Sequence, residues 1–154
     1  MLEMILAALR ATGIEEYIVT EEISQTAEMY FVRRKLDMPR MRDVTEYRVK
    51  VYREFVYSGE RMKGESEIKL APGVTALEVQ QQLIKAYEAA QYVRNKFFEA
   101  AEPVTGPEIP DIDAEYTPER LCTEAANVLF SADDDPEAFI NSAEIFGTAV
   151  KVRI

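Results

Sequence analysis

The chain has 154 residues, 47% of them hydrophobic, and carries a formal net charge of −10 with no histidine. This length and composition allow a core without a disulfide or metal, and the single cysteine, Cys122, excludes an internal disulfide and suits a reducing, cytoplasmic compartment. Without histidine, Ser-His-Asp triads, HExxH zinc sites and most zinc chemistry are excluded, so we expect no catalytic residue, cofactor or metal in this chain.

The first segments predict a helix followed by strands. Apolar residues recur at helical spacing from Leu2 to Leu9, and Gly13 can cap the end of that helix. Residues 17–19 and 29–32 are β-branched and aromatic, which predicts two strands joined by a polar turn at residues 24–26.

The next segment predicts an antiparallel hairpin. Residues 47–57 alternate in polarity, Ser58-Gly59-Glu60 suits a turn, and residues 61–70 alternate again. The polar face of the second run is expected to be wet; it holds Arg61, Lys63, Glu65, Glu67 and Lys69.

A long helix is expected to cover the dry face of this sheet. Thr75 and Glu78 form a capping box, and the apolar face of the helix comprises Val79, Leu83, Ala86, Tyr87, Ala90, Val93 and Phe97. The predicted fold class is therefore α+β, with an N-terminal helix and an antiparallel sheet covered on one face by a long helix.

The rest of the chain is expected to lie outside this first domain, residues 1–101. Residues 102–116 hold several prolines and predict a linker. Residues 117–154 predict a helix capped by Thr117 and a C-terminal strand, in which Val150, Val152 and Ile154 alternate with basic residues. That strand is expected either to lead toward a further domain or to be tucked into the sheet.

Three groups could suggest chemistry, and each has a plainer interpretation. Residues 133–135 are three aspartates, but they lack calcium-loop spacing and predict a solvated loop before a helix cap. In each of the pairs Glu15-Glu16 and Glu21-Glu22, the two side chains should point to opposite faces of a solvent-exposed strand. Cys122 lies on an apolar helix face and predicts a buried structural thiol.

Two surfaces are candidates for interactions. Residues 33–53 hold eight basic against three acidic side chains; the candidate surface within them comprises Arg33, Arg34, Lys35, Arg40 and Arg42. Such a surface could bind nucleic acid, although the chain as a whole is acidic. The second candidate is an open sheet edge at Val150, Val152 and Ile154.

Several stretches together resemble the opening part of TldD/PmbA proteins. They are Ile14-Glu15-Glu16-Tyr17, residues 27–32 (AEMYFV), the run RKLDMPRMRDVTEYRVKVYREF, the run GERMKGESEIKLAPGVT and, most specifically, residues 139–154 (FINSAEIFGTAVKVRI). The strand YRVKVYREF departs from the glycine-rich run that common members have there.

The resemblance implies cytoplasmic zinc metallopeptidases, formerly called modulators of DNA gyrase, that often act as paired subunits. Their zinc motif lies in a C-terminal domain, so zinc is expected only there and not in this chain. We expect this chain to be a non-catalytic N-terminal domain that contributes to a substrate cleft and a subunit interface. Its partners would be a homologous TldD/PmbA-type subunit and a peptide substrate, without membrane binding. The alternatives are a free-standing module that binds peptides or proteins through an open sheet edge and, more weakly, nucleic-acid binding through residues 33–53.

Overall fold

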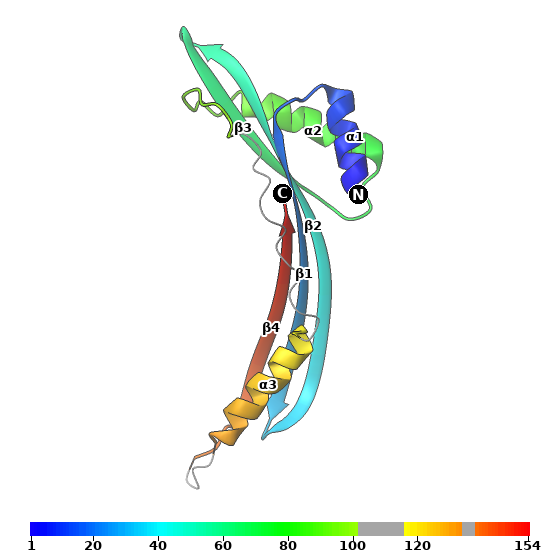
Figure 1. Ribbon diagram of the computed structural model, residues 1–154, viewed down its shortest axis with the longest axis vertical. Helices are drawn as coiled ribbons and strands as arrows, with labels where there is room; N and C mark the ends of the chain where they lie inside the picture. The colour runs from blue at the N-terminus through cyan, green and yellow to red at the C-terminus, as the bar shows by residue number, and fades with distance from the viewer. Residues whose placement is uncertain (102–115, 134–137) are drawn as a thin grey trace. The chain divides into compact units, whose positions relative to one another are not determined.

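The chain has the predicted α+β fold. The computed structural model describes residues 1–101, 116–133 and 138–154. In chain order the elements are α1 (Leu2–Thr12), β1 (Tyr17–Val32), β2 (Lys35–Tyr57), β3 (Glu60–Leu70), α2 (Ala76–Ala90), α3 (Pro118–Ser131) and β4 (Ser142–Arg153) (Figure 1). Within the described residues, the strands form an open antiparallel sheet of four strands in the order β3-β2-β1-β4.

The described residues divide into two compact units. The first unit comprises residues 1–22, 46–101 and 152–154, and the second comprises residues 23–45, 116–133 and 138–151. This grouping places part of β1 and β2 with α3 and β4. The domain limits predicted from composition stay a prediction, because residues 102–115 lie outside the described part of the chain.

The core of the first unit forms between its two helices and the β2–β3 hairpin. Ile5 and Leu9 of α1, Leu83 of α2 and Val49 and Val51 of β2 are all completely buried there. Helix α1 ends at Gly13, whose φ of 69° is the left-handed conformation that glycine adopts without strain. The apolar stripe of α1 therefore faces the core, as the sequence predicts. Thr75 and Glu78 also form the predicted capping box at the start of α2.

The hairpin also has the predicted turn. β2 and β3 pair antiparallel, from Tyr47 opposite Leu70 to Tyr57 opposite Glu60. Ser58 and Gly59 both have positive φ, as a two-residue turn of type I′ requires. The end of α2 packs directly on the backbone at Gly64, since a Cβ there would be 1.8 Å from the carbonyl oxygen of Ala90.

In the second unit, α3 packs along β1 and β4 (Figure 1). Thr117 caps α3 by accepting a hydrogen bond from the backbone of Arg120, as predicted. A Cβ at Gly147 would lie 2.4 Å from the carbonyl oxygen of Pro118, and the rings of Phe31 and Phe130 meet edge to face. The start of α3 therefore packs directly against the backbone of β4 at Gly147.

Three local predictions were wrong. Residues 24–26 are not a turn but the middle of β1, where Thr26 lies in hydrogen-bonding contact with Thr148 of β4. β2 begins at Lys35 rather than near residue 47, after a turn in which Arg33 and Arg34 have positive φ. Helix α2 ends at Ala90, so Phe97 belongs to a following segment.

Within the described ranges, none of the helices is both long and apolar enough to cross a membrane.

Candidate functional site

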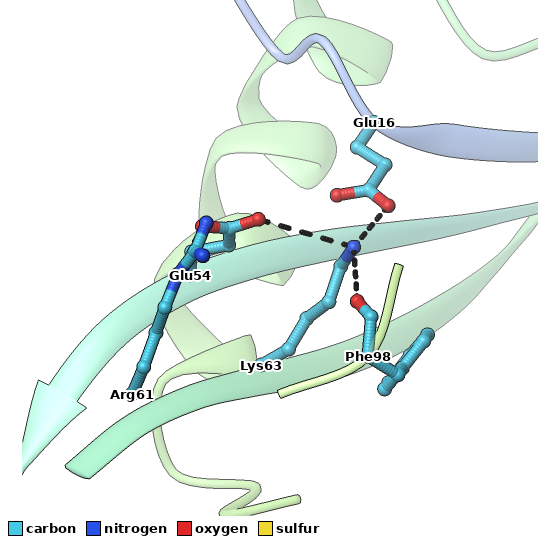
Figure 2. A network of polar contacts seen from close by, with 5 residues as sticks. All are labelled: Glu16, Glu54, Arg61, Lys63 and Phe98. Carbon is cyan, nitrogen blue, oxygen red and sulfur yellow. Dashed lines mark hydrogen bonds and ion pairs between the residues drawn. The ribbon is translucent and has the colours of Figure 1, made fainter. Parts of the chain in front are cut away.

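A buried lysine forms the centre of a polar cluster in the first unit. The side chain of Lys63 on β3 is only 2% exposed, although the alternation of β3 predicts a wet face there. Its ammonium group pairs with the carboxylate of Glu16, donates to the carbonyl oxygen of Phe98 over 3.1 Å and lies 4.0 Å from Glu54 (Figure 2). Burial of an ammonium is costly unless it is paired in this way.

Aromatic rings complete the surroundings of this lysine. Its nitrogen lies 4.9 Å from the ring centre of Phe98, 5.5 Å from that of Phe97 and 5.8 Å from that of Tyr52. The neighbouring Arg61 stacks on Phe97 at 3.7 Å and pairs with Glu54 at 2.7 Å. The segment after α2 is thus attached to the hairpin by cation–π and hydrogen-bonding contacts, which gives Lys63 a structural role.

A second buried group joins three strands of the first unit. Glu21 on β1 is buried, and its carboxylate accepts hydrogen bonds from the Tyr47 hydroxyl at 2.5 Å and from Arg153 at 3.0 Å. The hydrogen bond from Tyr47 lowers the pKa of Glu21 below its ordinary value, with help from Arg153 and against the effect of burial. The same bond raises the pKa of Tyr47. The sequence predicted a wet carboxylate here, and that prediction was wrong.

The predicted basic surface is partly neutralised. In the second unit, Arg34 donates to the carboxylate of Asp133 at 3.0 Å, and Arg40 pairs with Glu28 at 3.4 Å. Lys35 and Arg42 are exposed on β2. The five predicted residues therefore belong to one hairpin, and two of them are paired with carboxylates.

A shallow hollow lies beside the Arg33–Arg34 turn. It has a volume of about 430 Å³ and is lined by Arg33, Arg34, Asp133, Phe139 and Ile140. Asp133 also accepts a hydrogen bond from the backbone of Ile140, and its side chain is only 6% exposed. The prediction of a solvated loop at residue 133 was therefore wrong. Residues 134 and 135 and the expected helix cap lie outside the described residues.

The predicted edge strand lies at the end of the sheet. β4 is the last strand in the order, and Val150, Val152 and Ile154 are 45%, 52% and 91% exposed. Phe146, which the sequence reasoning did not single out, is 62% exposed on the same strand. Phe146 lies four residues before Val150, so the alternation of the strand places both on the same face and could have predicted that Phe146 is exposed as well.

Among the described residues, the one thiol that could bind zinc is enclosed by the protein. There is no histidine in the sequence, and the thiol of Cys122 is buried against the carbonyl oxygens of Ala27 and Ile145. Burial raises the pKa of this thiol, which disfavours the thiolate that would bind a metal. Across the described stretches, no group of three or more acidic or cysteine side chains is placed to hold a metal ion.

The comparisons with known proteins rest on structure alone. No protein-family model matches the chain, and no curated protein matches it by sequence. Two solved structures are similar to it. The structure of TldE from Thermococcus kodakarensis matches 97% of this chain with a TM-score of 0.58 at 12% identity. A Thermotoga maritima protein described as a candidate modulator of a DNA gyrase matches 98% with a TM-score of 0.53 at 13% identity.

The match covers only part of those proteins. This chain corresponds to 34% of the TldE chain and 33% of the Thermotoga chain, so it spans about a third of the length of each. At such low identity the likeness shows the fold. The fold of this chain therefore resembles that of the matched third of each of these two proteins.

Proposed function

We propose that this chain acts as a non-catalytic module of a TldD/PmbA-like protein, in which it supplies an interface and leaves the chemistry to another domain. The observation that carries this proposal is the structural match over 97% of the chain to one third of TldE. The histidine-free sequence supports it, because the family's zinc motif needs imidazole ligands. The remaining two thirds of such a protein would carry zinc and bind the peptide substrate.

The arrangement of polar groups also supports a non-catalytic role. Lys63 and Glu21, the two best-buried charged side chains of the first unit, are paired with protein groups. Glu21 is held ionised by Tyr47 and Arg153, and Lys63 is fixed beneath aromatic rings. Both clusters pair their charges with neighbouring protein groups, which supports a structural role for them. The cytoplasm is the compartment we propose, in keeping with one buried free thiol.

The test uses the chain together with a TldD/PmbA-type catalytic polypeptide encoded in the same genome. We expect the purified chain alone to contain no stoichiometric zinc and to cleave no peptide, and the mixture to co-elute as one complex in size-exclusion chromatography with light scattering. Chelator-sensitive peptide cleavage by the chain alone, or failure to bind any such catalytic polypeptide, would contradict the proposal.

The exposed edge of β4 favours a second candidate, a free-standing module that captures an extended peptide or protein strand. Binding of fluorescent extended peptides, measured by anisotropy, tests it; no binding of any peptide at high concentration would remove it. Nucleic-acid binding through residues 33–53 is weakened, since Arg34 and Arg40 already pair with carboxylates. A titration with single-stranded DNA at low salt decides that alternative.

A further inference from the structure

Residues 95–98 lie along the outer edge of β3 as a short extended segment, which we call the strap. The backbone N–H of Lys63 donates to the carbonyl oxygen of Asn95 at 3.0 Å, and the N–H of Phe97 donates to that of Arg61 at 3.3 Å. These two bonds flank an isolated antiparallel bridge between the strap and β3. The strap is therefore bonded to β3 over a short stretch, whereas all 11 residues of β3 are paired with β2 on its other side.

The side chains of the strap pack on the surface of the hairpin. All four remain at least partly exposed, and Phe98 is 39% exposed. The ring of Phe97 stacks on the Arg61 guanidinium at 3.7 Å, and Phe98 meets the ring of Tyr52 edge to face at 5.9 Å. Partly exposed side chains and backbone hydrogen bonds at the edge of a sheet are typical of segments that open at low free-energy cost.

The charge of Lys63 stays compensated when the strap leaves. Among the described oxygen atoms around its ammonium group, the carbonyl oxygen of Phe98 belongs to the strap, whereas the carboxylates of Glu16 and Glu54 do not (Figure 2). Glu16 is also held independently, because its carbonyl oxygen accepts a hydrogen bond from the N–H of Tyr52 at 3.0 Å. Opening thus exchanges one carbonyl oxygen for water and avoids the large cost of an unpaired buried charge.

We propose that the strap opens by itself, without unfolding of the sheet, and that this opening controls access to Lys63. In the closed state Lys63 is 2% exposed. The open state presents its ammonium group to solvent, together with the N–H of Lys63 and the C=O of Arg61 at the edge of β3. This inference concerns the first unit alone and does not depend on the interface role proposed above.

The first experiment is native-state hydrogen exchange of the full chain, read by NMR at increasing denaturant. The amides of Lys63 and Phe97 report the strap. Met62 and Gly64 are the controls on the same strand, because N–H groups alternate in direction and theirs point toward β2. We expect the two strap amides to exchange at least about tenfold faster than the controls and with little dependence on denaturant, as in a local opening. Exchange of all four amides through one global unfolding would overturn the proposal.

The second experiment measures access to the amine of Lys63 by acylation with an N-hydroxysuccinimide ester, read by peptide mass spectrometry. In the native chain Lys63 should react slowly and Lys69, whose side chain is 60% exposed, should react quickly. Phe97→Ala should raise the rate at Lys63 by about tenfold, because it removes the ring that holds Arg61 and faces the ammonium. Tyr92→Ala is the matched control, since it removes a ring that is 77% exposed just before the strap and should leave the rate unchanged.

Each outcome bears on the strap directly. A native Lys63 that is acylated as fast as Lys69 would show that the strap does not cover it in solution. An acceleration by Phe97→Ala no greater than that by Tyr92→Ala would show that the strap does not control access. Circular dichroism and the melting temperature check that both variants are folded, and hydrogen exchange of the native chain decides the question if Phe97→Ala is not.

Discussion

The hydroxyl of Tyr47 on β2 donates a 2.5 Å hydrogen bond to the buried carboxylate of Glu21 on β1. Arg153 of β4 donates to the second oxygen of the same carboxylate, so one charged group connects three strands of the first unit. Hydrogen bonds to a buried charged group contribute more to stability than neutral ones.

Tyr47→Phe should lower the free energy of unfolding by about 1–3 kcal/mol at pH 7, because it removes one donor from an ionised carboxylate. Chemical denaturation measures this loss. Tyr92→Phe is the control, since Tyr92 is 77% exposed and its substitution should cost little. Equal losses from both variants would contradict the importance of the Tyr47–Glu21 bond.

The same carboxylate predicts a pH dependence. The pKa of Glu21 is lower in the folded chain than its ordinary value of 4.5, so its contribution to stability is fully present above pH 4.5. The contribution should disappear as the pH falls through the lowered pKa. The difference in stability between the native chain and Glu21→Gln should therefore shrink in unfolding experiments run from pH 6 to acid pH. A difference that grows toward acid pH would reverse the assigned direction of the pKa shift.

The Lys63–Glu16 pair predicts an asymmetry between its two members. Glu16→Ala leaves a buried ammonium with weaker partners. It should lower the free energy of unfolding by about 1–3 kcal/mol. Lys63→Met places an apolar chain among the rings of Phe97 and Phe98, and it leaves a carboxylate that is 31% exposed and can be hydrated. Lys63→Met should therefore lower the free energy of unfolding by less, under about 1.5 kcal/mol.

Denaturant unfolding of both variants and of the double variant checks this asymmetry. The double variant should be no less stable than Glu16→Ala alone, because the unpaired ammonium is gone. A greater loss from Lys63→Met than from Glu16→Ala would show that the lysine acts mainly through its aromatic contacts.

Much of the fold follows from local signals in the sequence. The hairpin of β2 and β3 was predicted because two alternating runs flank Ser58-Gly59, which suits a turn with positive φ. The caps at Gly13, Thr75 and Thr117 were predicted because each uses a residue type with a specific backbone role. These features depend only on near neighbours in the chain.

The missed features depend on distant ones. The turn at Arg33-Arg34 lacks the usual glycine or asparagine, and residues 24–26 are polar yet stay extended because Thr26 meets Thr148 far along the chain. Lys63 alternates like a solvent-facing residue, but the segment of Phe97 and Phe98 folds back over it. No pattern within β3 reports which segment will cover it.

Gly147→Ala should destabilise α3 against β4. A Cβ at this position would lie 2.4 Å from the carbonyl oxygen of Pro118 and 3.0 Å from Sγ of Cys122, and a backbone carbonyl cannot move aside as a flexible side chain can. We expect the free energy of unfolding to fall by about 1–3 kcal/mol, the usual effect of overpacking. Val128→Ala, on an exposed position of the same helix, should change stability by less than about 0.5 kcal/mol. An unchanged melting temperature in Gly147→Ala would mean that α3 is free to move away from β4.

The thiol of Cys122 should react only when the second unit opens. Its side chain is fully buried between α3, to which it belongs, and strands β1 and β4, and burial raises its pKa, so both access and thiolate formation are suppressed in the folded chain. We expect alkylation by a maleimide or a disulfide reagent to be slow at neutral pH and to become fast in denaturant. A Val128→Cys variant provides an internal control, because it adds a thiol at a position that is 70% exposed on the same helix. Its time course should show one fast and one slow thiol in equal amounts, and Gly147→Ala should accelerate only the slow one, since a loosened α3 uncovers Cys122 more often. A native Cys122 that reacts as fast as the added thiol would show that α3 does not pack on β1 and β4 in solution.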